Sequence, residues 1–232
     1  MTERDELPAL PAGLRWDLLD PSALDAVEAL HQASISGTTA DLVKPESRQF
    51  LKSLLDGRGR VLGVLRDEEL VAYGVLQHDL LPADDPRPQL GLAPTRPVRK
   101  LAGAAVARAW RGRGLQRRLI QARIRLAGAV GLLFATAGPA NTVSWVNLMR
   151  CGFEVRAIEH RYGGYARLLL ALEPLAANAA TPRADDGSAE ELVQALDLAR
   201  QQALLRAGWH GVEPLPAEAS IRYRRGIERR HA

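Results

Sequence analysis

Apolar side chains recur along this chain with two spacings, one typical of strands and the other of helices. Short apolar runs lie at residues 14–18, 60–66, 70–77, 98–106, 132–137, 153–159 and 165–172, and each predicts a strand. Residues 20–34, 45–57 and 115–128 instead repeat apolar positions every three or four residues, which predicts helices. A shorter helix is expected around Trp145, ending at Gly152. The alternation of the two patterns predicts an α/β (α+β) domain.

The C-terminal part of the chain is expected to form a small helical extension. Residues 176–187 are rich in Ala, Pro, Asp and Gly, which predicts a linker. Ser188 and Glu191 then match a capping box for a helix carrying Leu192, Leu196, Ala199 and Ala203 and ended by Gly208. The expected organisation is a segment 1–13, a domain 14–175, a linker 176–187, and a C-terminal helix with a basic tail in 188–232. The apolar stripe of this helix must pack on the domain or on a second copy, in a homodimer.

Composition favours a folded protein that stays in the cytoplasm. Hydrophobic residues make up 47% of the chain and charged residues 25%, which excludes global disorder. The longest apolar runs fall short of the roughly 18 residues of a membrane span, and the charged N-terminus lacks a signal-peptide core. The single Cys151 excludes an intrachain disulfide and is interpreted as a packing residue. The five histidines show no ligand spacing, so no metal site is expected.

The net charge of +4 is concentrated at the C-terminal end. Arginine occupies positions 222, 224, 225, 229 and 230 there, against one acid, Glu228, so this tail accounts for the whole excess. A solvated tail is the favoured interpretation. Binding of nucleic acid through the tail is a less favoured alternative, and it requires an affinity that falls steeply with salt.

A glycine-rich turn between a predicted strand and a predicted helix carries the strongest chemical signal. Gly112 and Gly114 have no Cβ, so a ligand can approach the backbone closely. The helix that follows turns its free N–H groups toward this turn, and Arg111, Arg113 and Arg117 add positive charge. The pattern predicts a site for a phosphorylated ligand. The alternative is a helix that follows an ordinary surface turn, with solvated arginines.

Two motifs in order resemble the GNAT superfamily of acyl-CoA-dependent N-acetyltransferases. Arg111-x-x-Gly114-x-Gln116 is similar to the family's glycine-turn pattern, and Asn141-x-x-Ser144 leading into Met149-Arg-Cys-Gly-Phe153 is similar to its Asn-containing segment. The resemblance covers about residues 14–174. It implies a mixed, mostly antiparallel central sheet flanked by helices.

The resemblance also implies a function and a set of site residues. Acetyl-CoA would lie between the strand ending near Val106 and the strand 132–137. Its pyrophosphate would bind the backbone N–H groups of Arg111, Gly112, Arg113, Gly114, Leu115 and Gln116. Asn141 and Ser144 would order the cofactor site, although Asn141 can also be a simple helix cap. The implied reaction is direct transfer of the acetyl group to a primary amine of a small molecule or a protein, with a backbone N–H at Val106 or a neighbour stabilising the developing oxyanion.

Three departures from the family pattern leave the catalytic groups open. Gln116 replaces a small residue, and Leu148 stands where many members carry a Tyr that protonates the thiolate. The strand 98–106 contains no carboxylate, so the base is expected to be His78 with Asp79, Glu159 with His160, or solvent. These gaps motivate an alternative function, an acyl-CoA sensor without turnover. The Pro-rich segment 80–97 is the expected acceptor-binding loop or lid.

Overall fold

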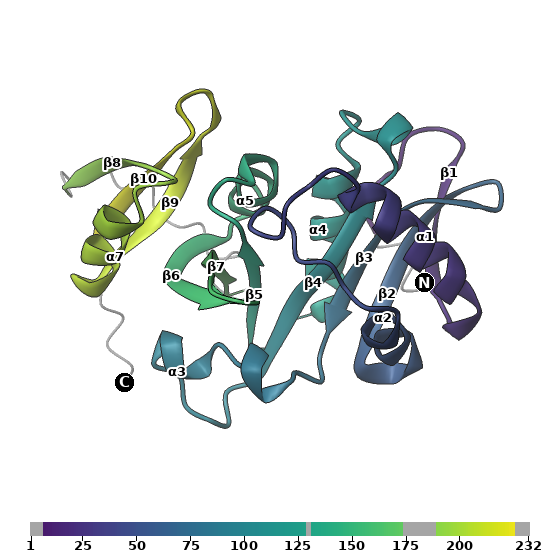
Figure 1. Ribbon diagram of the computed structural model, residues 1–232, viewed down its shortest axis with the longest axis horizontal. Coiled ribbons are helices and arrows are strands. Elements are labelled where there is room, and N and C mark those ends of the chain that lie inside the picture. The colour runs from purple at the N-terminus through teal and green to yellow at the C-terminus, as the bar shows by residue number, and fades with distance from the viewer. Residues whose placement is uncertain (1–6, 129–130, 174–188, 226–232) are drawn as a thin grey trace.

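The computed structural model describes residues 7–128, 131–173 and 189–225, and a ten-stranded sheet runs through all three segments (Figure 1). The strand order is β1-β2-β3-β4-β5-β7-β6-β9-β10-β8. The strands are β1 Leu14–Leu19, β2 Gly59–Arg66, β3 Glu69–Gln77, β4 Val98–Val106, β5 Leu132–Ala137, β6 Glu154–Arg161, β7 Tyr165–Leu172, β8 Glu190–Gln194, β9 Trp209–Leu215 and β10 Ser220–Arg225. Neighbouring strands in the described sheet are antiparallel except β4 and β5, which confirms the expected mixed, mostly antiparallel sheet.

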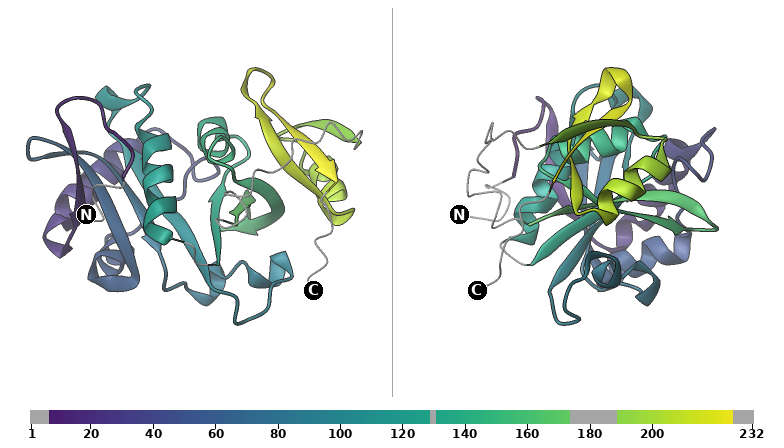
Figure 2. Two further views of the ribbon diagram at one scale, coloured as in Figure 1. Left: turned by 180° about the vertical axis from the view of Figure 1, so that it is seen from behind. Right: turned by 90° about the vertical axis from the view of Figure 1, so that its left-hand side faces the viewer.

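Helices cover both faces of this sheet (Figure 2). They are α1 Leu24–Ile35, α2 Arg48–Ser53, α3 Arg87–Leu90, α4 Leu115–Ala127, α5 Thr142–Met149 and α7 Leu198–Arg206. Side chains alternate between the two faces of a strand, so Tyr73 and Val75 of β3 pack under α1 and α2. Ala72 of the same strand packs on the opposite side, against Leu119 of α4. The central strands are therefore buried between two helical layers.

Capping residues decide where the helices start. Asp20 accepts a hydrogen bond from Ser22 N at 2.8 Å ahead of the short 3₁₀ turn that leads into α1. The second helix was expected from Pro45, but α2 begins at Arg48 because Ser47 is its cap, with Oγ accepting from Phe50 N at 3.2 Å. Pro45, Glu46 and Ser47 therefore belong to the loop between α1 and α2.

The parallel strands β4 and β5 separate along their length. Their pairing covers only Val98 with Leu132, Arg99 with Leu133 and Lys100 with Phe134. Beyond these pairs β4 continues to Val106 while β5 turns toward β7. Ala104 is exposed although it lies in the middle of the sheet. The edge of β4 from Leu101 to Val106 therefore faces a gap in the sheet rather than a neighbouring strand.

The C-terminal extension was predicted as one long helix, and this prediction is wrong. The described part is β8, α7, β9 and β10, and α7 begins only at Leu198, where Asp197 caps Arg200 N at 3.0 Å. Val193 and Ala195 are buried whereas Leu192 and Leu196 are exposed, so burial follows the two-residue period of a strand. The match of Ser188 and Glu191 to a capping box was coincidental.

The extension packs on this chain's own sheet. Gly211 of β9 pairs with Val155 of β6, and a Cβ at Gly211 would lie 3.0 Å from Val155 Cβ, so glycine permits the close approach. Leu204 of α7 is buried in the same core as β6. Within the basic tail, Arg222 and Arg224 form ion pairs with Glu190, while 226–232 and the expected linker 176–187 lie outside the described residues. The described helices include none that is long and apolar enough to cross a membrane.

Candidate functional site

A β-bulge in β4 marks the centre of the site. Gly74 of β3 pairs with Ala104, but two positions further along β3, Leu76 pairs with Leu101, so β4 holds one extra residue at Ala102 and Gly103. Ala107 N donates to Val71 O at 2.9 Å in the register that continues from Ala104. Alternation along the antiparallel pair then turns the N–H groups of Ala104 and Val106 away from β3, into the gap.

A buried arginine supports this bulge from the α4 side. Arg123 of α4 is 2% exposed, and its Nη1 donates to Val75 O at 3.1 Å and to Ala102 O at 3.2 Å. Its Nε donates to Leu119 O at 3.0 Å. The side chain fits because it lies over Gly74, where a Cβ would come within 3.0 Å of the guanidinium carbon. Burial lowers the pKa of Arg123 to about 10, so it remains charged at neutral pH.

The glycine turn adopts the left-handed backbone that its sequence predicts. Gly112 has φ 77° and Gly114 has φ 74°, and Gly114 is the N-cap of α4. The first N–H groups of α4, starting at Leu115, lack partners within the helix and face the turn. Leu115 itself is buried, so only its backbone is available there. The backbone geometry expected of this turn is present, and a helix start of this kind is suited to binding an anion.

The two arginines of the turn have different surroundings: Arg111 makes hydrogen bonds that hold the turn, and Arg113 is exposed. Arg111 Nε donates to Val106 O at 3.2 Å and its Nη2 to Ser34 O at 3.2 Å, which ties the end of α1 to the turn. Arg113 is exposed, with its guanidinium carbon 4.6 Å from the centre of the Trp110 ring. Arg111 therefore fixes the carbonyl of Val106 while the Val106 N–H remains directed at the gap.

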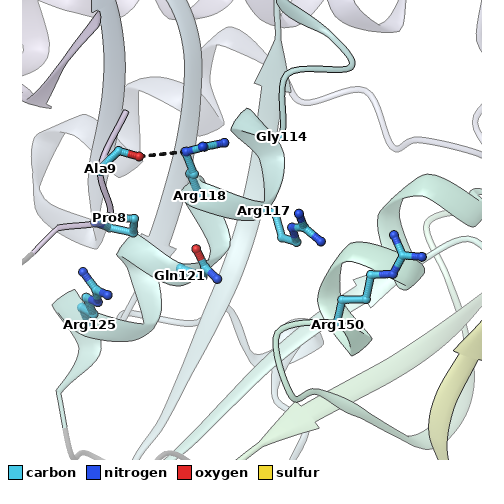
Figure 3. A pocket seen from close by; sticks show the side chains of 8 residues that line it. All are labelled: Pro8, Ala9, Gly114, Arg117, Arg118, Gln121, Arg125 and Arg150. Carbon is cyan, nitrogen blue, oxygen red and sulfur yellow. Dashed lines mark hydrogen bonds between the residues drawn. The ribbon is translucent and has the colours of Figure 1, made fainter. Parts of the chain in front are cut away.

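A pocket of about 410 Å³ opens beside Gly114 and is strongly basic (Figure 3). Its lining consists of Pro8, Ala9, Gly114, Arg117, Arg118, Gln121, Arg125 and Arg150. Arg118 is held by Ala9 O at 2.8 Å and Arg113 O at 3.0 Å. Arg117 on α4 and Arg150, directly after α5, lie on the same side of the pocket (Figure 3). The pocket can accept phosphate groups next to the glycine turn.

Helix α5 closes the other side of this region. Gln116 Oε1 accepts a hydrogen bond from Asn147 Nδ2 at 2.9 Å, so the unusual Gln116 bridges α4 and α5. Asn141 caps α5, with Oδ1 accepting from Ser144 N at 3.2 Å. The Asn141 Nδ2 also donates to Leu42 O at 3.3 Å, which connects α5 to the loop between α1 and α2. Asn141 and Ser144 thus form a cap, and Leu148 is buried in the core.

The loop between α1 and α2 brings a carboxylate over the bulge, which spacing along the sequence does not reveal. A Cβ on Gly103 would lie 3.9 Å from Glu46 Cγ and 3.7 Å from Tyr73 Oη. Glu46 N donates to His31 Nε2 at 2.9 Å, and His31 Nδ1 lies 2.9 Å from Tyr73 Oη. The Glu46 side chain is 12% exposed, and Lys44 Nζ lies 2.9 Å from its Oε2.

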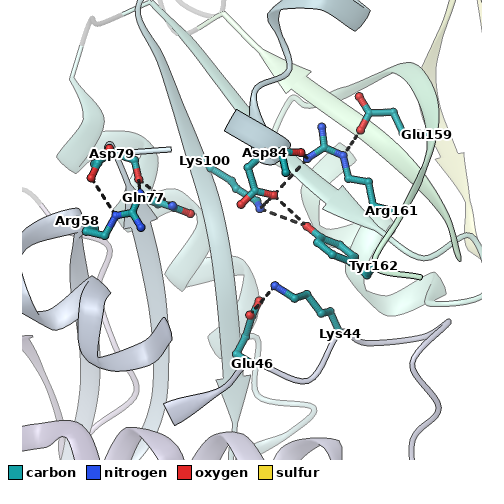
Figure 4. Close-up of polar contacts among 11 residues, drawn as sticks. Lys44, Glu46, Arg58, Gln77, Asp79, Asp84, Lys100, Glu159, Arg161 and Tyr162 are labelled. Carbon is teal, nitrogen blue, oxygen red and sulfur yellow. Dashed lines mark hydrogen bonds and ion pairs between the residues drawn. The ribbon is translucent and has the colours of Figure 1, made fainter. Parts of the chain in front are cut away.

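A second acidic group lies in a buried network beside this loop (Figure 4). Asp84 accepts from Lys100 Nζ at 2.8 Å and from Arg161 Nη1 at 3.2 Å, and Tyr162 Oη lies 3.4 Å from it. Burial acts to raise the pKa of Asp84, but the neighbouring cations outweigh it and lower this pKa below its usual value. Asp84 is therefore an ionised structural partner of Lys100, and it brings the Pro-rich segment 80–97 to the start of β4.

The predicted base candidates lie elsewhere. His78 and Asp79 are exposed after the end of β3, and Asp79 Oδ2 pairs with Arg58 Nε at 2.9 Å (Figure 4). Glu159 is buried and forms an ion pair with Arg161, while His160 is exposed on β6. The structure joins Val106 to Arg111 of the glycine turn and Gln116 to Asn147 of α5, the helix that Asn141 caps, whereas Asp79 and Glu159 form ion pairs elsewhere.

Comparison with known proteins identifies the family. A model of the acetyltransferase (GNAT) family matches residues 26–153, more than half of the chain. The chain belongs to the GNAT acetyltransferase family. The matched range extends from α1 to the end of α5, so it includes the bulge, the glycine turn and the Asn141 cap. No sequence among the curated proteins matches.

Solved structures of GNAT proteins share the fold. The ribosomal-protein-S18-alanine N-acetyltransferase of Escherichia coli is 17% identical, with a TM-score of 0.53 over 68% of this chain and 92% of that one. A probable acetyltransferase of Staphylococcus epidermidis is 19% identical, with a TM-score of 0.53 over 68% and 98%. The putative acetyltransferase yncA of Salmonella typhimurium, solved with acetyl-CoA, is 15% identical, with a TM-score of 0.50 over 70% and 94%. GNAT proteins use acetyl-CoA as cofactor, and the gap, the inward N–H groups and the glycine turn of this chain fit such a ligand.

Proposed function

We propose that this protein is an N-acetyltransferase that transfers the acetyl group of acetyl-CoA directly to a primary amine of a small molecule or a protein. The observation that carries the proposal is the bulged, unpaired edge of β4, which presents backbone N–H groups to a gap that ends at an anion cradle. When bound, acetyl-CoA supplies an activated acyl group as a thioester.

The donor side of the reaction follows from this edge. We assign the pyrophosphate to the N–H groups at Arg111, Gly112, Arg113, Gly114, Leu115 and Gln116, and the remaining phosphate to the pocket at Arg117 and Arg150. The N–H groups of Ala104 and Val106 are held by the strand itself. They can therefore donate to a carbonyl oxygen as negative charge develops on it, without reorganising.

Catalysis is favoured over an acyl-CoA sensor without turnover by a specific feature. The sensor hypothesis depended on the missing carboxylate in β4 and the missing Tyr at Leu148. The loop between α1 and α2 places Glu46 over the same strand, so a carboxylate is available at the gap. Leu148 is a core residue, and a thiol leaving group departs with little need of an acid because its ordinary pKa is about 8.5.

The test is release of free CoA thiol from acetyl-CoA in the presence of a panel of primary amines, including peptides with a free N-terminus. Turnover with at least one amine supports the transferase. Binding of acetyl-CoA without thiol release across the panel would instead establish a sensor.

A charge-selective variant pair tests the cradle. Gly112→Asp and Gly112→Asn have the same size and the same strain at φ 77°, and open space surrounds the position. We expect Gly112→Asp to bind acetyl-CoA at least tenfold more weakly than Gly112→Asn, because only the aspartate carries a negative charge that repels the pyrophosphate. Equal dissociation constants in calorimetry would contradict the assignment.

A further inference from the structure

We propose that Glu46 is the general base that removes the proton from the acceptor's ammonium group. The proposal rests on the proposed acetyl transfer. It assigns a base to a loop segment, in place of the strand position and of the candidate pairs at His78 and Glu159.

The placement of Glu46 is the first argument. Its Cγ and the Tyr73 hydroxyl lie 3.9 Å and 3.7 Å from the point where a Cβ on Gly103 would be, and Gly103 has no side chain to fill that space. Gly103 belongs to the bulge, next to the N–H of Ala104 that faces the gap. An amine that reaches the gap from this side therefore passes within reach of the Glu46 carboxylate before it meets the edge of β4.

The second argument is that the backbone at Glu46 is fixed by a buried histidine. His31 is 2% exposed, and its Nε2 accepts the Glu46 N–H, so the proton of the neutral ring must lie on Nδ1. Burial and the charge of Lys44 lower the pKa of His31, which keeps the ring neutral. The Nδ1–H then donates to Tyr73 Oη, and the hydroxyl proton of Tyr73 is left to point toward the space above Gly103.

The charged surroundings suit a base. Lys44, Lys100 and Asp84 are the ionised groups that act on Glu46 from its own loop, from β4 and from the turn before α3. Burial raises the pKa of Glu46 even though Lys44 and Lys100 oppose the rise. The Glu46 carboxylate therefore accepts a proton more readily than an exposed glutamate. Burial together with the charge of Glu46 raises the pKa of Tyr73, so the phenol stays protonated.

The proton and electron balance is complete without another reactant. The ammonium group gives one proton to a Glu46 oxygen and becomes a neutral amine. Its nitrogen lone pair forms the new C–N bond at the thioester carbonyl carbon, the C–S bond breaks, and its electron pair leaves with sulfur. The second proton lost by nitrogen passes to the thiolate, and Glu46 returns its proton to solvent.

The experiment compares the full-length wild type with Glu46→Gln and Glu46→Asp. The control is Glu28→Gln, which removes a carboxylate of α1 that is paired with Arg48 of α2. Thiol release is measured against pH with the best amine of the panel and with methoxyamine, whose nitrogen is unprotonated at neutral pH. We expect Glu46→Gln to lose about 100-fold or more in kcat with the amine and to lose the acidic limb of the profile, while it keeps acetyl-CoA affinity and most of its rate with methoxyamine. Glu46→Asp should recover part of kcat, and Glu28→Gln should match the wild type.

The two levels of the proposal fail differently. A wild type that turns over, with a Glu46→Gln variant that binds acetyl-CoA and keeps the wild-type kcat and pH profile, overturns the role of Glu46 alone. An equal loss with methoxyamine and the amine also overturns it, because a base is not needed for methoxyamine. A wild type that binds acetyl-CoA but releases no thiol with any acceptor overturns the transferase itself.

Discussion

Arg123 offers the sharpest test of how the bulge is maintained. The perturbation is Arg123→Met, which keeps an unbranched apolar stem in α4 but removes the donors to Val75 O, Ala102 O and Leu119 O. Hydrogen bonds from a charged donor contribute about 1.5–3 kcal/mol each, so three sum to about 4–9 kcal/mol. The lowering of the Arg123 pKa to about 10 corresponds to a cost of about 3 kcal/mol for burying the charged guanidinium. The uncharged methionine does not incur this cost, so it is subtracted. The net loss of unfolding free energy is then about 1–6 kcal/mol.

The assay for Arg123 is urea unfolding followed by circular dichroism, with thiol release measured on the same samples. Arg206→Met is the control, because Arg206 lies exposed at the end of α7, outside the lining of the basic pocket, and should change stability by less than about 0.5 kcal/mol. Arg123→Lys should recover little, since a single ammonium group does not span the carbonyls of two strands. We also expect kcat to fall, because Ala102 O loses the donor that holds the bulge. An Arg123→Met protein with wild-type stability and wild-type kcat would refute the reasoning.

Three further predictions concern the pocket, the extension and the bulge. Arg150→Met should raise the KM for acetyl-CoA about tenfold but leave the KM for 3′-dephospho-acetyl-CoA unchanged, and equal effects on both donors would remove the phosphate from this pocket. Burial and Arg156 lower the pKa of His210 to about 4, and its contact with Glu154 at 3.6 Å is too long to offset this. The neutral ring therefore contributes stability above about pH 6.5 that is lost as pH falls toward 4, about 2 kcal/mol after solvent screening. His210→Asn should flatten this acid limb in urea titrations, and an unchanged limb would contradict it. In Gly103→Ala the new methyl group would lie at ordinary contact distances of 3.7 Å from Tyr73 Oη and 3.9 Å from Glu46 Cγ, so the variant should be as stable as the wild type. It should nevertheless lose most of kcat, because the methyl group fills the space that the acceptor amine needs. Full activity would show that the acceptor does not use this space.

The structural elements of the proposed donor side could be predicted from the sequence because they are local. Strand, glycine turn and helix follow one another within residues 98–127, and each is specified by its own residues: small apolar side chains, positive-φ glycines and an amphipathic repeat. The Asn141 cap likewise depends only on Ser144, three residues later. The same locality misled the prediction at the C-terminus. Leu192 and Leu196 fit a helical spacing there, while Val193 and Ala195 fit a strand, and only contact with β6, β9 and β10 decides between them.

The acceptor side could not be predicted, because its groups come from distant segments. Glu46 and Gly103 lie close together although they are 57 positions apart in the sequence. The resemblance to the family leads one to expect a carboxylate near β4, but it does not indicate that the loop between α1 and α2 supplies it. Arg123 is one of four arginines in residues 117–125, and the sequence does not indicate that it alone is buried, over Gly74 of a distant strand. The substitution of Gln116 for a small residue is explained by Asn147, a partner that sequence spacing does not indicate.

A base supplied by a loop must be held as firmly as one built into a strand, and the contacts around residues 36–47 meet this requirement. Arg167 of β7 donates to the carbonyls of Ala40 and Asp41, and Asn141 donates to Leu42 O. Gly138 has no Cβ, and a Cβ there would collide with Asp41 O. Asn141 and the Gly138 turn therefore act on the acceptor side as much as on the donor side, because they fix the loop that carries Glu46. A change at either position should disturb the acceptor reaction even where acetyl-CoA still binds, which separates this role from that of a helix cap alone.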